Sequence, residues 1–162
     1  MLGYAYHIAE NLSLCWAGHN DQDYLGLAEI VHLSEIDNHD DLVAVLRSNL
    51  AELMPVNLLY ITVDDHFGYA ELGKQPIRRH PHMGMFIKNG TLPENDWVGF
   101  VKPEQRLQVS DVERGYLVTA NNKPASSKYL GGIYDTNMYT GRADRIEQLL
   151  AESIASGAKL TK

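Results

Sequence analysis

The stretch GYLVTANNKP, residues 115–124, combines the two features on which the fold and the site depend. Residues 116–120 form a mostly apolar run, which predicts a buried strand. Two primary amides, Asn121 and Asn122, follow at once. A buried amide without a partner costs about 1–3 kcal/mol, so the pair either forms a turn or belongs to a site. Asn is common in turns, whereas an amide N–H that points at a developing oxyanion contributes about 3–4 kcal/mol to catalysis.

The composition is that of one globular domain. The chain has 162 residues, a formal net charge of -7 and 44% hydrophobic residues. The acidic balance argues against nucleic acid as a partner, and no apolar run approaches the roughly 18 residues of a spanning helix, so no membrane association is expected either. Arg78-Arg79 is too short a basic cluster to change this, and the lone Cys15 has apolar neighbours that favour a buried thiol.

The pattern of apolar residues predicts a mixed, α+β chain with antiparallel hairpins. Helices are expected over 38–50, where Asn38 can cap the first turn, and over 142–154, where Gly157 ends the helix. The expected strands and irregular parts are a strand over 11–18, a hairpin of 59–63 with 67–72, and loops with short strands over 73–107.

The histidines and a Ser-Asn pair allow other interpretations. His80 and His82 form a His-x-His pair, with His66 upstream, and such a pair on a strand can bind zinc. A solvated loop explains the same residues without a metal. The pair Ser48-Asn49 lies inside the first predicted helix, so we interpret it as structural.

Several segments, taken in order, resemble the β-chain of the penicillin acylase (penicillin amidase) family. Members of that family carry a doubled Asn before Pro, followed by a helix that opens with arginines, as in GYLVTANNKP and YTGRADRIEQLL here. The matching segments lie within about residues 12–161 and are LSLCWAG (12–18), NLLYITVDDHFGYAELGKQPIR (57–78), NDWVGFVKPEQRLQVSDVERGYLVTANN (95–122), YLGGIYD (129–135) and YTGRADRIEQLL (139–150).

The resemblance implies a part of an αββα sandwich, the fold of N-terminal-nucleophile hydrolases. In that family, self-cleavage exposes a serine as the first residue of the β-chain. Its hydroxyl attacks an amide carbonyl, and its own α-amino group acts as the base, usually through a water. An α-amine titrates near ~8, so no histidine is needed. The resemblance also implies that members are commonly periplasmic or secreted, although no signal peptide is visible in this chain.

Four residues fall on functional positions of the family. Asn121 matches the oxyanion-hole asparagine, and Arg145 matches an arginine near the amine of the nucleophile. Arg142 occupies a neighbouring arginine position and is the weaker candidate. Asp135 lies where some members place a calcium ligand, so calcium is the one cofactor that the resemblance suggests. Without the resemblance, Arg145 would be interpreted as a surface partner of nearby acidic side chains on its helix.

The catalytic serine and the calcium-binding aspartates that follow it in the family have no match in this sequence. We therefore expect residues 1–162 to be a single segment from the middle of a β-chain, inactive alone. Its partners would be the rest of the amidase, namely the nucleophile-bearing segment and the α-chain. Its substrate would be a small N-acyl amide, such as a β-lactam or an acyl-homoserine lactone. The alternative is a non-catalytic scaffold or binding protein derived from the same fold.

Overall fold

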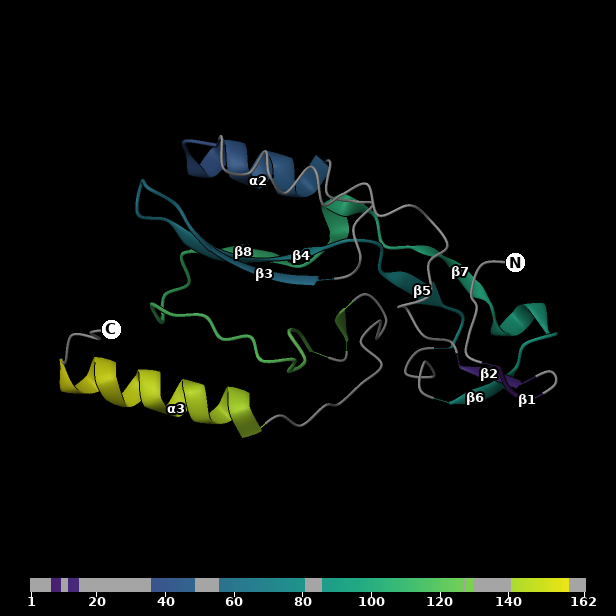
Figure 1. Cartoon of the computed structure of the whole chain (residues 1–162). Helices are drawn as coiled ribbons and strands as arrows, with labels where there is room; N and C mark the ends of the chain where they lie inside the picture. The colour runs from purple at the N-terminus through teal and green to yellow at the C-terminus, as the bar shows by residue number, and fades with distance from the viewer. Residues whose placement is uncertain are drawn as a thin grey trace.

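The computed structural model describes residues 7–9, 12–14, 36–48, 56–80, 86–126, 128–129 and 141–157. Within the described residues, a run of short strands separates an α-helix near the start from one near the end, and each strand pair is antiparallel, which confirms the α+β expectation (Figure 1). The elements are β1 (His7–Ala9), β2 (Leu12–Leu14), α2 (His39–Ser48), β3 (Val56–Ile61), β4 (Phe67–Leu72), β5 (Pro76–Arg78), β6 (Ile87–Asn89), the 3-10 turn η3 (Pro93–Asn95), β7 (Trp97–Phe100), the 3-10 turn η4 (Pro103–Gln105), β8 (Gln108–Ser110) and α3 (Gly141–Ser156).

Three small sheets organise the described strands, in the orders β1-β2-β6, β3-β4-β8 and β5-β7. The sheet β3-β4-β8, called the central sheet below, contains the predicted hairpin of β3 and β4. The two strands pair from Val56 opposite Leu72 to Ile61 opposite Phe67. β5, β6 and β7 match the short strands expected between residues 73 and 107. In β7, the Trp97 ring packs edge-on against the Phe100 ring, with 5.8 Å between the ring centroids. Of the strand predicted over 11–18, Leu12–Leu14 is a strand, and residues 11 and 15–18 lie outside the described residues.

The first strand of the hairpin ends at Ile61, two residues before the end predicted from the sequence. The backbone N–H of Thr62 donates to the carbonyl of His66 at 2.8 Å, and the Thr62 hydroxyl oxygen accepts from the His66 N–H at 3.2 Å. Asp65 adopts φ 66°, a left-handed conformation that Asp tolerates and that a three-residue hairpin loop requires. Val63, predicted to lie in the strand, is therefore in the turn and 87% exposed.

The core lies between α2 and one face of the central sheet. Its buried members are Leu42 and Leu46 from the helix and Ala70 and Leu72 from β4. Leu58 and Tyr60 of β3 pack against this cluster, because alternate residues of a strand share a face. The helical stripe predicted from the sequence thus covers the sheet, as Figure 1 shows for α2 above β3, β4 and β8.

The N-terminus of α2 is capped by Asn38, as the sequence predicts. The Asn38 side-chain oxygen accepts the Asp41 backbone N–H at 2.9 Å, and its Nδ2 donates to the Asp41 carboxylate at 2.7 Å. This reciprocal pair satisfies one of the free N–H groups of the first turn. Asp40 and Asp41 also place negative charge where the helix dipole favours it.

The predicted strand over residues 116–120 is wrong. The segment is partly buried but has no regular secondary structure, because no neighbouring strand among the described residues supplies a backbone ladder to it. It runs between the central sheet and α3, which lies on the side of the sheet opposite to α2 (Figure 1). The apolar character was identified correctly, but a strand also needs a partner.

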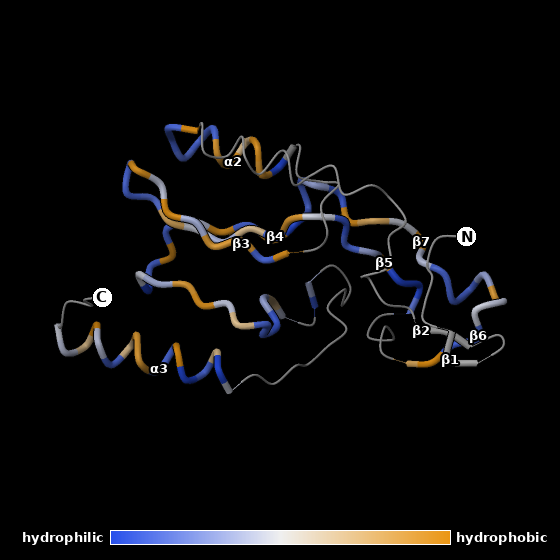
Figure 2. Tube along the Cα trace, in the orientation of Figure 1, coloured by the Kyte–Doolittle hydropathy of each residue, from blue (hydrophilic) through white to orange (hydrophobic). Residues whose placement is uncertain are grey.

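The predicted C-terminal helix is confirmed as α3, and Gly157 follows it with φ 66°. Its predicted apolar stripe remains largely open to solvent, with Ile146 41%, Leu149 47% and Ile154 55% exposed. Figure 2 shows hydrophobic and hydrophilic stretches alternating along α3. Within the described part of the chain, no helix is long and apolar enough to cross a bilayer.

Candidate functional site

The doubled amide lies in a tight bend. The Asn122 side-chain oxygen accepts the backbone N–H of Ala120 at 2.9 Å, and Asn121 adopts φ 63°, in the left-handed region. Such a conformation is uncommon for residues other than glycine but is accessible to Asn. The turn alternative from the sequence is therefore confirmed for Asn122, and the site alternative stays a prediction for Asn121. Asn122 performs the turn chemistry, and the side chain of Asn121 is left to make contacts outside the turn.

The central sheet holds the start of this bend. Asn57 of β3 donates from Nδ2 to the Thr119 hydroxyl oxygen at 3.4 Å. The Asn57 side-chain oxygen in turn accepts from the Tyr69 hydroxyl at 2.8 Å. Burial and the nearby Glu71 carboxylate raise the pKa of Tyr69, so its hydroxyl keeps its proton and remains a donor. The bend is thereby connected to two neighbouring strands.

Helix α3 holds the bend from the other side. One guanidinium nitrogen of Arg142, Nη2, donates to the Asn121 side-chain oxygen at 2.7 Å and to the Ala120 carbonyl at 3.2 Å. A second arginine connects the preceding residues to α3. Arg114 pairs with Glu147 of α3 at 2.6 Å and donates to the Tyr116 carbonyl at 2.9 Å. Polar contacts with α3 thus fix both ends of the 114–122 segment.

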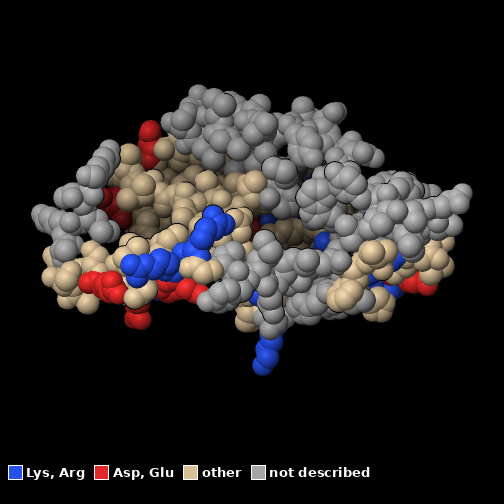
Figure 3. All heavy atoms as spheres, turned by 60° about the horizontal axis from the view of Figure 1, so that its bottom comes forward, with Lys and Arg blue, Asp and Glu red and all other residues tan. Residues whose placement is uncertain are grey.

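Arg145, the stronger arginine candidate from the sequence, lies one turn further along α3. Its side chain is exposed and donates to Gln148 at 2.8 Å, on the same helix. The acidic partners considered from the sequence are not the ones it contacts, and Arg142 rather than Arg145 contacts Asn121. In the space-filling view, basic and acidic side chains lie side by side over the part of the surface where α3 runs (Figure 3).

Several sequence candidates lie outside the described residues. They include Asp135, Cys15, His82 and Asn49, whereas Ser48 is the last residue of α2. Within the described ranges, no group of three or more His, Cys, Asp and Glu side chains could hold a metal ion. Calcium binding at Asp135, which the resemblance suggests, therefore stays a prediction. The described residues contain no further group of ligands that would support it.

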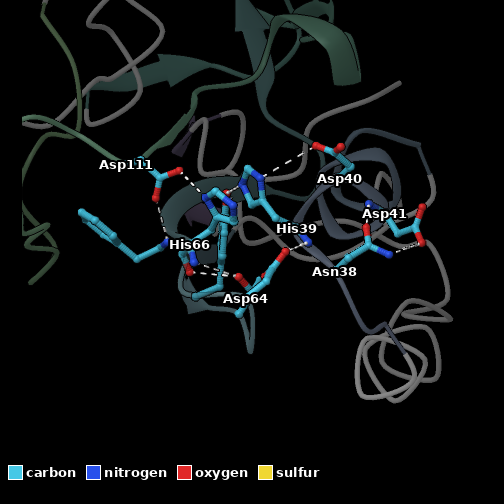
Figure 4. A network of polar contacts seen from close by, with 10 residues as sticks. Asn38, His39, Asp40, Asp41, Asp64, His66 and Asp111 are labelled. Atoms are coloured by element: carbon cyan, nitrogen blue, oxygen red, sulfur yellow. Dashed lines mark hydrogen bonds and ion pairs between the residues drawn. The ribbon is translucent and has the colours of Figure 1, made fainter.

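A second polar cluster, not anticipated from the sequence, joins the hairpin turn to the start of α2 and the end of β8 (Figure 4). His66 contacts Asp111 through Nδ1 at 2.7 Å and stacks on the His39 ring at 4.6 Å. His39 contacts the Tyr60 hydroxyl at 3.3 Å, and its backbone N–H donates to Asp64 at 3.2 Å. His66 and Asp111 are 45 positions apart in sequence, and the pairing of β4 with β8 brings them together.

The charges of this cluster reinforce one another. The hydrogen bond to Asp111 raises the pKa of His66, with smaller contributions from Asp64 and Asp40. The Phe67 backbone N–H, at 3.0 Å, and His66 lower the pKa of Asp111. The side chains are about half exposed, so the pair acts as a polar connection at the tip of the hairpin. This pair lies at the turn of the hairpin. The bend with the doubled amide lies elsewhere, where Thr119 contacts β3 and Asn121 contacts the first turn of α3.

The fold has a counterpart among solved structures. The chain is similar to a thermostable penicillin G acylase from Alcaligenes faecalis, with a TM-score of 0.58 and 20% sequence identity over 78% of this chain. At that identity the likeness shows the fold alone, which is that of the N-terminal-nucleophile hydrolases. The match covers 22% of the solved chain.

The family follows from the sequence comparison. The family model for penicillin amidase matches residues 3–162, so the chain belongs to the penicillin amidase family. It is also similar to the acyl-homoserine lactone acylase QuiP of Pseudomonas aeruginosa, with 29% identity over 100 residues, which are 62% of this chain. The match covers 12% of that relative, so this chain spans a small part of the length of the proteins it resembles.

Proposed function

We propose that the protein to which this chain contributes hydrolyses the amide bond of small N-acyl compounds, and that this chain supplies part of the oxyanion hole. The observation that carries the proposal is the orientation of the Asn121 side-chain amide. Its oxygen is occupied by Arg142 at 2.7 Å, so its Nδ2 is the end available to an incoming oxygen. Membership of the penicillin amidase family supports acyl-amide chemistry in general.

The proposed reaction is acyl transfer to a serine that this chain does not carry. The serine hydroxyl adds to the amide carbonyl and passes its proton, through water, to the α-amine of the same serine. The carbonyl oxygen then carries a negative charge, and an N–H of Asn121 donates to it. Collapse expels the protonated amine and leaves an ester, which a water hydrolyses to the carboxylic acid. Arg145 would lie near the α-amine, where its positive charge favours the neutral, basic form.

Exposed apolar side chains on the sheet and on α3 support the proposal that further segments of the acylase pack against this chain. On the sheet face away from α2, Leu59 is 43% and Ile61 78% exposed, and the stripe of α3 is also exposed. The extended 116–120 segment runs between these surfaces. A sandwich would cover such faces with a second sheet, and this burial contributes about 25 cal/mol per Å² of apolar area. The nucleophile-bearing segment and the α-chain are the proposed occupants.

Two named relatives support the proposed substrate class. One is named for penicillin G and the other for acyl-homoserine lactones, and both substrates carry an acyl group on an amide nitrogen. We propose that the complete protein accepts an N-acyl compound of this kind, with the leaving amine set by residues beyond this segment.

The test is the variant Asn121→Ala in the complete acylase. Turnover of an N-acyl substrate should fall by about 10²–10³-fold, the usual effect of removing one oxyanion donor. Asn122→Ala, which removes a turn contact one residue away, is the matched control for a change in the bend itself. Near-normal turnover of Asn121→Ala would reject the oxyanion role. A complete protein with no acylase activity at all would favour a scaffold or binding protein of the same fold.

A further inference from the structure

We propose that Arg142 is a positioning residue that fixes which end of the Asn121 amide faces the reacting oxygen. This inference rests on the proposed function and gives a part to Arg142, which the sequence offered only as the weaker of two arginine candidates. The starting observation is a single guanidinium nitrogen that contacts both the side-chain oxygen of Asn121 and the carbonyl of Ala120, at 2.7 and 3.2 Å.

The first step concerns donors and acceptors. A primary amide has two nearly isosteric ends, an accepting oxygen and a donating NH₂ group. A guanidinium carries donors only, so the short contact at 2.7 Å is favourable when the oxygen faces Arg142. The reversed amide would direct two N–H groups at a cation and would lose that bond. Arg142 therefore selects one of the two orientations of the Asn121 amide.

The second step concerns the backbone. The Ala120 carbonyl bonds to the same guanidinium nitrogen, and the Ala120 N–H is held by the Asn122 side chain at 2.9 Å. Both backbone polar groups of Ala120, the residue before Asn121, are thus held by hydrogen bonds. With the backbone of Asn121 at φ 63°, rotation of its side chain is the main freedom left, and the Arg142 contact restricts that rotation.

The third step separates Arg142 from Arg145. Both side chains start from the first two turns of α3, but Arg145 donates to Gln148 on its own helix, and Gln148 donates to Glu152. This i, i+3 and i, i+4 chain stabilises the helix surface and makes no contact with the bend. Arg142 is the arginine of the two that reaches Asn121.

The consequence is a catalytic effect that binding alone would not reveal. A donor aimed at an oxyanion stabilises the transition state more than the ground state, so misorienting it lowers kcat with little change in KM. Without Arg142 the amide oxygen would face the oxyanion for part of the time. The positive charge of Arg142 is also transmitted through the amide, since polarisation of Oδ1 makes the N–H groups better donors.

The experiment uses the complete acylase, with kcat expressed per active site titrated by the acyl-enzyme burst. Arg142→Met keeps the aliphatic stem and removes the donors, and it should lower kcat by about 10–10²-fold with KM changed by less than about threefold. Arg142→Lys restores a donor and should recover most of the loss. Arg114→Met is the matched control, because Arg114 also contacts α3 but touches neither Asn121 nor Ala120.

A double variant distinguishes this inference from the proposed function. Added to Asn121→Ala, the change Arg142→Met should cause no further loss of kcat, because its effect passes through the missing amide. If Asn121→Ala lowers kcat but Arg142→Met leaves it unchanged, the positioning role is wrong and the oxyanion role stands. If the two losses add in full, Arg142 acts by another route. If Asn121→Ala has no effect, both roles fall together. If Arg142→Met yields no folded enzyme, Arg142→Gln takes its place under the same criteria.

Discussion

The imidazole Nδ1 of His66 lies 2.7 Å from a carboxylate oxygen of Asp111, and this contact joins the tip of the β3-β4 hairpin to the end of β8. Asp111 also exchanges backbone contacts with Phe67, since its N–H donates to the Phe67 carbonyl at 2.9 Å and its carboxylate accepts the Phe67 N–H at 3.0 Å. The stacked His39 brings the first turn of α2 to the same point. The β3-β4 hairpin, β8 and α2 therefore meet at one titratable pair.

The pair predicts a pH dependence of stability. The pKa of His66 is raised from 6.5, so its contribution is complete below 6.5 and is lost as pH rises through the folded-state value. The pKa of Asp111 is lowered from 3.8, so its contribution is complete above 3.8 and is lost as pH falls through the folded-state value. Both contributions are present between these limits. His66→Gln should therefore destabilise the protein more at about pH 5.5 than at about pH 9, measured by urea unfolding.

Asp111→Asn serves as the companion variant. It keeps an acceptor for the Phe67 N–H but removes the negative charge that strengthens this bond. Part of its cost should therefore persist at high pH, where His66 is neutral. If the destabilisation by His66→Gln were the same at both pH values, the ionic character of the contact would be disproved.

The cap of α2 gives a prediction that concerns stability alone. Asn38→Ala removes the acceptor for the Asp41 N–H and should cost about 1 kcal/mol in the free energy of unfolding. Asn38→Asp keeps the acceptor but places a second carboxylate beside Asp41, so its loss should be smaller than that of Ala. Equal losses for both variants would indicate that the side-chain oxygen is not what caps the helix.

Gly68 predicts a steric effect within the central sheet. A Cβ at this position would lie 2.3 Å from the end of the Tyr60 ring and 2.7 Å from the Val109 carbonyl oxygen. The ring lies across the glycine as its cross-strand partner, and the backbone oxygen of β8 has little room to move. Gly68→Ala should therefore cost about 1–3 kcal/mol, seen as a lower Tm.

The combination with Tyr60→Leu separates the two clashes. A smaller side chain relieves the contact with the ring but leaves the backbone contact, so the double variant should recover part of the loss caused by Gly68→Ala. A Gly68→Ala protein with unchanged Tm would contradict the close packing of β3, β4 and β8.

The sequence predicted those elements whose causes are local. The cap at Asn38, the apolar stripe of α2 and the hairpin are set by residues near one another, so periodicity and turn chemistry were sufficient. The segment 116–120 was misassigned because strand formation depends on a partner that no local pattern contains. The resemblance identified the family and named both arginines of α3 as candidates, but the contact between Arg142 and Asn121 became evident only from the structure.

The contacts between distant residues could not be predicted for a related reason. His66 and Asp111 meet because of the register between β4 and β8, and Asn57 meets Thr119 because a loop returns across the sheet. Each of these contacts is a consequence of the tertiary fold. Sequence alone showed only a histidine beside two aspartates in a turn and a polar residue shortly before a predicted strand.

Asn121→Asp tests the donor and the contact with α3 independently. A carboxylate keeps the bond from Arg142 and strengthens it by charge, so the folded chain should be at least as stable. It has no N–H to offer and adds a negative charge where the oxyanion forms, so turnover of an N-acyl substrate by the complete acylase should fall by at least about 10²–10³-fold. The matched control is Asn122→Asp, in which the carboxylate still accepts the Ala120 N–H and should leave turnover close to normal. Retained activity in Asn121→Asp, with Tm unchanged, would show that the amide serves only to hold the bend against α3.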